Sequence, residues 1–171
     1  MIAKRVLVLP YDKKWDSYFK KLKSVLAVAL YSCPVTIEHV GSTSVPGLSA
    51  KPILDVDIIL NAGASFNDVK ERLEGAGYRH EGDLGISGRE AFRCDDMPGL
   101  MKHHLYVCAE DSRELKRHLA FRDHLRACPV DRDRYSRIKT EAALAYPWDI
   151  DGYMLAKAPF IQEIYAKLGL E

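Results

Sequence analysis

The sequence has no long apolar run, and this absence argues against a membrane-spanning helix. Its longest apolar run, Val25 to Tyr31, is far shorter than the roughly 20 residues that a membrane-spanning helix needs. The apolar stretch near the N-terminus is also too short for a secretory signal. We therefore expect a cytoplasmic protein with no membrane partner.

An excess of charge of either sign is also lacking. The chain has 25 basic and 24 acidic residues, so its formal net charge of +1 creates no overall field that favours DNA, RNA or an anionic membrane. No basic stripe with interleaved aromatic residues is present, although RNA-binding surfaces usually have one. Nucleic acid is therefore an unexpected partner, and an enzyme that modifies RNA is disfavoured.

Cysteine is scarce, and the four cysteines form no C-x-x-C pair. They are Cys33, Cys94, Cys108 and Cys128. This wide spacing predicts reduced, mostly buried thiols rather than a disulfide framework or a zinc site.

Length, composition and the order of predicted elements favour one domain of the α+β class. A chain of 171 residues, 47% hydrophobic and 29% charged, suits a single domain with a sizeable core. Strands and helices mix without regular βαβ alternation in the first two-thirds, and helices fill residues 112–171, with breaks at Pro129 and Pro147. We expect a small mixed β-sheet flanked by helices, followed by a helical C-terminal third.

The individual elements follow from apolar periodicity and turn residues. A helix is expected from the N-cap Asp12 to before Pro34, and another over 66–74 with Ser65 as its cap. Strands are expected at 4–9, 35–41, 53–60, 90–94 and 103–109, with one more before the turn-rich segment 81–90.

The strand 53–60 carries two aspartates, Asp55 and Asp57, in an otherwise apolar run. Because side chains alternate along a strand, both carboxylates share one face, about 7 Å apart at ~3.3 Å per residue, and the other face is wholly apolar. Two such carboxylates repel one another unless a cation offsets them. Mg²⁺ is one such cation. Pairing with arginines or capping of a neighbouring helix is an equal alternative on the strand pattern alone.

The loop that precedes this strand consists of small residues. Its segment Gly41-Ser42-Thr43-Ser44 can turn backbone N–H groups and hydroxyls toward an anion, as phosphate-binding nests do. The spacing of a Walker loop is absent. An anion cradle followed by two metal-binding carboxylates is what a nucleoside triphosphate with Mg²⁺ requires.

The spacing of loop and aspartates resembles a known signature. Val40-Gly41-Ser42, twelve residues and then Asp55-Val56-Asp57 is similar to the signature of polymerase-beta-type nucleotidyltransferases. The wider stretch 37–58 resembles the GrpB family of nucleotidyltransferase-like proteins more specifically. Further matches follow in order over essentially the whole chain: YDKKW, GISGREAFR, HHLYV, LAFRDHLRA, the segment 135–139, Tyr153 and Lys157.

This resemblance implies a nucleotidyltransferase-type fold and a site for Mg²⁺ and a nucleotide. By the resemblance, Asp55 and Asp57 would bind Mg²⁺ and act in catalysis. Gly41 and Ser42 would hold the triphosphate, helped by Ser44.

The resemblance also identifies a departure from the usual catalytic pattern. Superfamily members that transfer nucleotides usually have a third carboxylate on a neighbouring strand, which here is 103–107 and carries no acid. Tyr106 also replaces the second histidine of the His-Leu-His that the family has there. His104 is the candidate catalytic residue on this strand, as a general base or nitrogen ligand, with a structural histidine as an equal alternative.

Basic residues at family positions are candidates for the rim of an anionic pocket, because arginine forks match phosphate oxygens. Singly, each is more simply a solvated charge or a salt bridge, but the set together favours a phosphate pocket. They are Lys51, Arg89, Arg93, Arg122, Arg126, Lys139 and Lys157.

The favoured function is an Mg²⁺-dependent transfer of a nucleoside monophosphate from a nucleoside triphosphate to a small-molecule acceptor. The alternative is a non-catalytic module that binds a nucleotide or a phosphometabolite. A relation to coenzyme A is implied only by family members fused to dephospho-CoA kinase. The missing third carboxylate favours the module.

Overall fold

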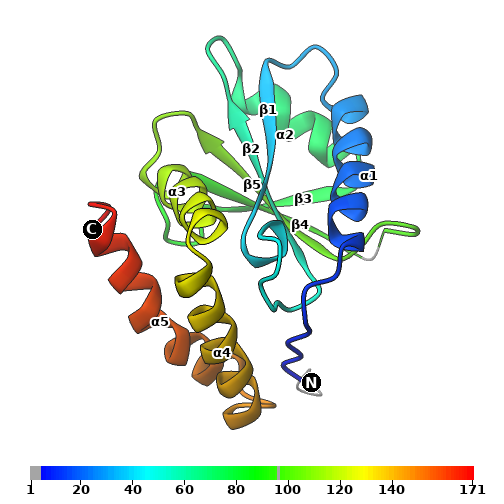
Figure 1. Cartoon of the computed structure of the whole chain (residues 1–171). Coiled ribbons are helices and arrows are strands. Elements are labelled where there is room, and N and C mark those ends of the chain that lie inside the picture. The colour runs from blue at the N-terminus through cyan, green and yellow to red at the C-terminus, as the bar shows by residue number, and fades with distance from the viewer. Residues whose placement is uncertain (1–4, 96) are drawn as a thin grey trace.

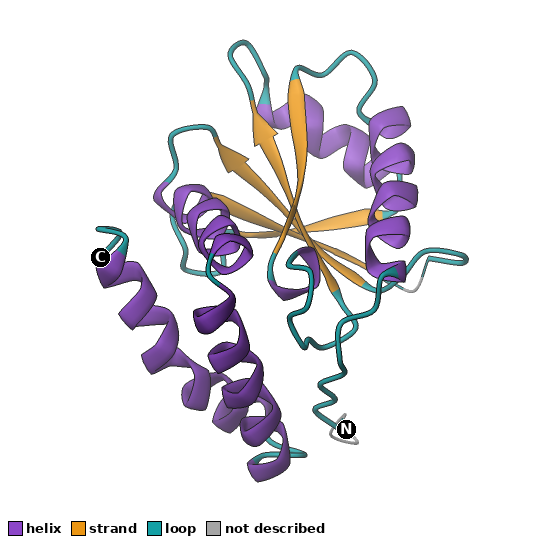
Figure 2. Ribbon diagram, viewed as in Figure 1, coloured by secondary structure: helices purple, strands orange, loops and turns teal. Residues whose placement is uncertain are grey.

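The structure is a computed structural model that describes residues 5–95 and 97–171. Within these residues, a five-stranded sheet has the order β1-β2-β5-β4-β3. The strands are β1 (Val35–Val40), β2 (Leu54–Leu60), β3 (Tyr78–Gly82), β4 (Arg89–Cys94) and β5 (His103–Ala109). The helices are α1 (Lys14–Ala29), α2 (Phe66–Gly75), α3 (Arg113–Ala127), α4 (Pro129–Ala145) and α5 (Ile150–Lys167), with a short 3-10 turn η1 (Ser42–Ser44). The fold is therefore α+β with a mixed sheet and a helical C-terminal portion, as expected (Figure 2).

The sheet is mixed because only β2 and β5 run parallel. The other neighbouring pairs, β1–β2, β4–β5 and β3–β4, are antiparallel. The prediction that 103–107 lies beside the strand with the two aspartates is confirmed by this pairing. Figure 1 shows α1 and α2 on one side of the sheet and α3 on the other.

Alternation along β2 divides the sheet into an apolar face and a polar one. Leu54, Val56 and Ile58 have no exposed surface and belong to the core that α1 and α2 form with the sheet. On α1, Leu22 and Leu26 are equally buried in this core. Asp55 and Asp57 consequently point to the opposite face, where α3 packs.

Local signals explain most of the helix ends. The Ser65 hydroxyl accepts a hydrogen bond from the Asp68 N–H at 3.3 Å and caps α2, as predicted. The Asp12 carboxylate accepts from the Lys14 N–H at 2.9 Å, although the N-cap residue of α1 is Lys13. α1 also ends at Ala29, before the expected Pro34. Pro129 occupies the first turn of α4, where a missing N–H costs nothing.

The predicted strand over residues 4–9 is wrong for the part that the structure describes, and Lys4 lies outside the described residues. Residues 5–8 form no strand of the sheet, and Leu9 makes only an isolated antiparallel bridge with Ala50. The Val6 N–H donates to the Pro147 carbonyl at 2.8 Å. The segment therefore satisfies its backbone against loops rather than against the sheet.

The helical C-terminal portion packs on the loop that precedes β2. Val45 and Leu48 of that loop are buried in one cluster with Leu125, Tyr135 and Phe160 of the three last helices. This cluster places α4 and α5 beside the loop and therefore near the start of β2. No helix within the described residues is long and apolar enough to span a bilayer.

Candidate functional site

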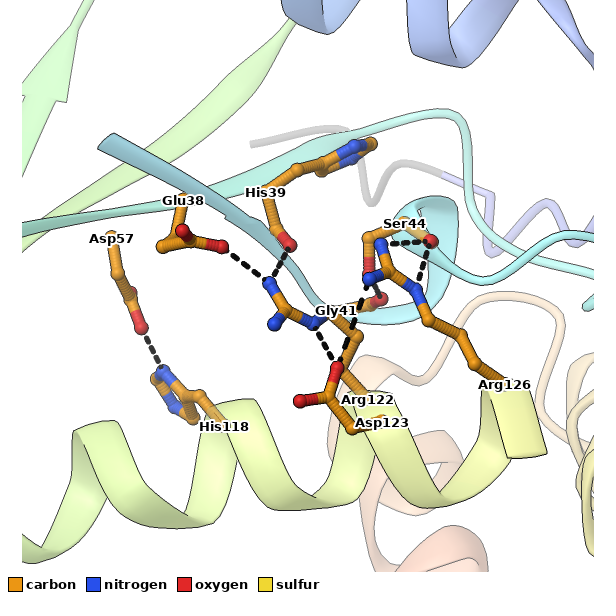
Figure 3. A network of polar contacts seen from close by, with 9 residues as sticks. All are labelled: Glu38, His39, Gly41, Ser44, Asp57, His118, Arg122, Asp123 and Arg126. Carbon is orange, nitrogen blue, oxygen red and sulfur yellow. Dashed lines mark hydrogen bonds and ion pairs between the residues drawn. The ribbon is translucent and has the colours of Figure 1, made fainter. Parts of the chain in front are cut away.

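Asp57 is a carboxylate with no exposed surface at all. Its Oδ2 lies 2.7 Å from Nδ1 of His118 on α3, and its buried Oδ1 has no hydrogen-bond partner among the described residues (Figure 3). A buried oxygen of this kind is costly unless something binds it. One oxygen of Asp57 is therefore held by the protein and the other is available.

Asp55 is the more accessible of the two aspartates. Its Oδ1 lies 2.9 Å from Nδ1 of His104, and both side chains are partly exposed. In the β2–β5 register, His104 lies opposite Asp55 and Tyr106 opposite Asp57. A histidine and a tyrosine thus lie on the neighbouring strand, at the positions where nucleotidyltransferases usually have a third carboxylate. The two aspartates pair with histidines, not with arginines or a helix end.

His118 connects the site to a further carboxylate. Its Nε2 lies 3.5 Å from Glu114 Oε1, one turn earlier on α3. Burial opposes protonation of this ring, but hydrogen bonds to Asp57 and Glu114 outweigh burial and raise the pKa of His118 to about 9. An imidazolium therefore offsets the charge of Asp57. His118 was not among the residues predicted from the sequence, although the Glu114–His118 pair at i, i+4 spacing was a visible signal.

The turn between β1 and η1 lies directly against Asp55. Gly41 has φ +69°, and a Cβ added there would come within 2.8 Å of the Asp55 Cβ and closer still to its carboxylate. The Ser44 hydroxyl donates to the Gly41 carbonyl at 2.6 Å, which closes the turn. Glycine is required here by conformation and by space. The predicted cradle and the first aspartate are therefore adjacent.

Arg122 and Arg126 of α3 hold the chain on either side of this turn. Arg122 Nη1 donates to Glu38 Oε2 at 2.6 Å and to the His39 carbonyl at 3.0 Å. Arg126 donates to the Ser44 carbonyl through Nε at 3.1 Å and Nη2 at 2.8 Å (Figure 3). Both guanidinium groups also line a cavity of about 670 Å³ beside β1. Their observed contacts position the loop.

Three lysines at predicted phosphate-binding positions lie close to one another. The Nζ atoms of Lys51 and Lys157 lie 5.7 and 4.5 Å from the centre of the Tyr153 ring. Lys139, only 2% exposed, donates to the Ser49 carbonyl at 2.6 Å. Among the described residues, none of the three ammonium groups has a carboxylate within 4.0 Å.

Burial and mutual repulsion make these lysines unusual cations. Burial is the main reason that the pKa of each is lowered, to about 8 for Lys157. Neighbouring ammonium groups lower these pKa values further: Lys102 acts on Lys51, Lys51 acts on Lys157, and both Lys157 and Lys51 act on Lys139. The carboxylate of Asp55 acts on all three in the opposite direction. The lysines are therefore near enough to Asp55 to feel its charge, but none of them forms an ion pair with it. Their combined positive charge exceeds the single negative charge of this carboxylate.

Arg89 and Arg93 on β4 lie neither with the two arginines of α3 nor with the three lysines. The Arg89 guanidinium lies 4.3 Å from the centre of the Tyr106 ring, and its buried Nε has no hydrogen-bond partner among the described residues. Arg93 is exposed and lies 4.0 Å from Glu81. The predicted basic set is thus divided among β4, the α3 contacts with the turn, and the three lysines.

Comparison with solved structures defines the class of fold. The Cid1 poly(U) polymerase in its MgGTP-bound crystal structure superposes with a TM-score of 0.55 at 10% identity, over 78% of this chain and 45% of Cid1. The crystal structure of conserved protein GrpB from Enterococcus faecalis superposes with a TM-score of 0.80 at 35% identity, over 94% of this chain and 96% of that one. The fold is that of the nucleotidyltransferases.

Sequence comparison then gives the family. Residues 5–167 match the family described as GrpB protein, and the chain belongs to this family. The glutamate-rich protein GrpB of Alkalihalophilus pseudofirmus is 34% identical over 165 residues, which cover 93% of both chains. UPF0157 protein YqkA of Bacillus subtilis is 31% identical over 159 residues, covering 93% of this chain and 46% of YqkA. The chain therefore spans about half the length of that relative.

Proposed function

We propose that this protein binds a nucleoside triphosphate with Mg²⁺ and transfers its nucleoside monophosphate to a small-molecule acceptor. The observation that carries the proposal is the group formed by Lys51, Lys139 and Lys157. Lysines this buried are destabilising unless an anion offsets them. Because Asp55 is nearby and carries only one negative charge, a polyphosphate is the ligand that matches the remaining positive charge.

The two aspartates fit a divalent metal ion. Carboxylate oxygens are the ligands that Mg²⁺ prefers, and Asp57 offers a buried Oδ1 that has no partner among the described residues. Asp55 lies two residues away on the same face, partly exposed. When bound, Mg²⁺ would neutralise phosphate charge and help to align the attacking and leaving oxygens.

In the transfer, the acceptor oxygen would attack the α-phosphorus and the bond to the bridging oxygen would break, releasing pyrophosphate. His104 is suited to take the proton of the acceptor. Donation from its Nδ1 to Asp55 leaves Nε2 as the unprotonated nitrogen of a neutral ring. The lysines would hold the outer phosphates, while Gly41 lets the turn approach them closely.

The second candidate is a module that binds the nucleotide without transferring it. The observation that favours it is the β5 strand, which places His104 and Tyr106, and no acid, beside the two aspartates. In this case the lysines and aspartates would have the same ligand, and only the chemical step would be absent.

Calorimetry and pyrophosphate release test both candidates. The wild-type protein is titrated with each of the four nucleoside triphosphates with and without Mg²⁺, and so are Asp55→Asn and the control Asp68→Asn, which changes an exposed carboxylate on α2. We expect Mg²⁺-dependent binding that Asp55→Asn abolishes and Asp68→Asn retains. Binding by Asp55→Asn equal to wild type, or no binding by the wild type, would contradict the proposed site. Pyrophosphate release with an acceptor pool identifies the enzyme, and binding without release identifies the module.

A further inference from the structure

A second cluster of ligand atoms lies at the α3–α4 junction, away from the aspartates. Cys128 is the single residue between the two helices, and Pro129 directly after it begins α4. The resulting change of direction brings His124, in the last turn of α3, against Asp131, in the first turn of α4. Figure 1 shows this junction with α5 running alongside α4.

A histidine nitrogen and a cysteine sulfur lie there against one oxygen of a carboxylate. Asp131 Oδ2 lies 2.7 Å from His124 Nε2 and 3.4 Å from Cys128 Sγ. The three ligand atoms all lie within 4.8 Å of one another. Asp131 is buried, and its Oδ2 also accepts a hydrogen bond from Lys167 Nζ at 2.9 Å. A buried carboxylate oxygen thus lies beside a histidine nitrogen and a cysteine sulfur.

We propose that His124, Cys128 and Asp131 form a binding site for a transition-metal ion such as Zn²⁺. One imidazole nitrogen, one thiolate and one carboxylate oxygen are the ligands that Zn²⁺ takes in proteins, and three of them leave a fourth position for water or a ligand. Tetrahedral bonds of about 2.0–2.3 Å separate ligand atoms by roughly 3.3–3.7 Å. The 3.4 Å distance from sulfur to oxygen lies within this range, while the nitrogen and oxygen, 2.7 Å apart, must separate by at least about 0.6 Å.

The observed hydrogen bonds show which protons must leave or move when a metal ion binds. Cys128 loses its thiol proton to solvent when it becomes a thiolate ligand. His124 must present an unprotonated Nε2 to the metal ion, so the neutral ring carries its one proton on Nδ1. A neutral ring only moves this proton from Nε2 to Nδ1, so the thiol proton is the one released, and metal binding is expected to strengthen as the pH rises.

Lys167 of α5 competes for the same site. Its Nζ lies 2.9 Å from Asp131 Oδ2, so its positive charge opposes the approach of a metal ion to this oxygen. The Lys167 side chain is 55% exposed, so it can turn toward solvent when a metal ion binds. The ion pair thus marks Asp131 as a cation-binding carboxylate, and removing it should favour the metal.

Cobalt titration of the whole chain tests the proposal, because Co²⁺ bound to a thiolate gives a charge-transfer band in the near ultraviolet. The metal-free protein is titrated with Co²⁺ and then with Zn²⁺. We expect the thiolate band to appear and to be removed by Zn²⁺. Cys128→Ser and His124→Ala should abolish it, and the control Cys33→Ser, which changes a half-buried thiol far from the cluster, should retain it.

Two further variants separate this site from other metal sites. Lys167→Ala should tighten Co²⁺ binding by about two- to fivefold, the range expected when a partly exposed ion pair no longer competes. Asp55→Asn should retain the band, which keeps the result independent of the proposed nucleotide site. No thiolate band in the wild type, a band that survives Cys128→Ser in a folded protein, or unchanged affinity in Lys167→Ala would overturn the proposal.

Discussion

At the residue scale, a buried carboxylate is neutralised by an imidazolium. Asp57 and His118 lie 2.7 Å apart in a part of the site that solvent hardly reaches. His118 has a pKa of about 9 in the folded protein and an ordinary value of 6.5 when unfolded. The raised pKa means that this pair stabilises the fold fully below pH 6.5 and loses its contribution as the pH rises toward 9.

We therefore predict that His118→Gln destabilises the protein at pH 6 and much less at pH 9.5. A shift of this size corresponds to roughly 3 kcal/mol as an upper limit. Urea unfolding in EDTA at both pH values measures it. Glu114→Gln serves as the comparison, since it removes the weaker 3.5 Å contact with His118 and a 3.7 Å ion pair with Arg117, and it should cost under about 1 kcal/mol. A difference between wild type and His118→Gln that stays constant with pH would contradict the imidazolium.

Gly41 gives a second prediction at this scale, because its close approach to Asp55 can be separated from its backbone conformation. Gly41→Ala introduces both a strained positive φ and a contact with the Asp55 carboxylate. Gly63→Ala also has a positive φ, +83°, but its Cβ would meet nothing within 4 Å. We expect Gly63→Ala to cost about 1 kcal/mol and Gly41→Ala to cost at least 1 kcal/mol more in urea unfolding. Equal losses of unfolding free energy in the two variants would show that a Cβ at position 41 fits beside Asp55.

At the scale of elements, β2 could be predicted in detail and α3 could not. Apolar alternation determined the buried face of β2, and the same alternation placed the aspartates opposite it. The role of α3 depends on where the helix packs, which periodicity does not give. That its arginines bind phosphate stays a prediction; in the structure they contact Glu38, Asp123 and the carbonyls of His39 and Ser44. The segment 5–8 was mistaken for a strand because its apolar residues pack against a helix junction instead.

The contacts of α3 with the turn lead to a prediction about local stability. Arg126→Met removes both hydrogen bonds to the Ser44 carbonyl while keeping an aliphatic side chain. We expect faster amide hydrogen exchange in residues 41–45, with exchange in β2 and β5 unchanged. Arg134→Met, which removes an exposed ion pair with Glu163, is the matched control and should leave exchange in the turn as in wild type. Unchanged exchange in Arg126→Met would mean that the turn holds its own conformation.

At the scale of the whole molecule, the three lysines lead to a prediction that links the stability of the fold to anion binding. The helical portion holds Lys139 and Lys157 against the loop that carries Lys51, so folding itself brings three cations together. Burial lowers the pKa of Lys157 to about 8 from 10.5. Folding therefore disfavours its charged form, and this penalty is complete below pH 8 and disappears as the pH rises toward 10.5.

Lys157→Met should for this reason stabilise the ligand-free protein while weakening the binding of inorganic triphosphate. At pH 7 we expect a gain of about 1–3 kcal/mol in the free energy of unfolding, which shrinks between pH 8 and 10.5. Triphosphate at 100 times its dissociation constant should stabilise the wild type by about 2.7 kcal/mol and the variant by less. Lys116→Met, at an exposed position of α3, should change neither quantity. A variant that loses stability yet binds triphosphate like wild type would mean that Lys157 serves packing and that the anion binds elsewhere.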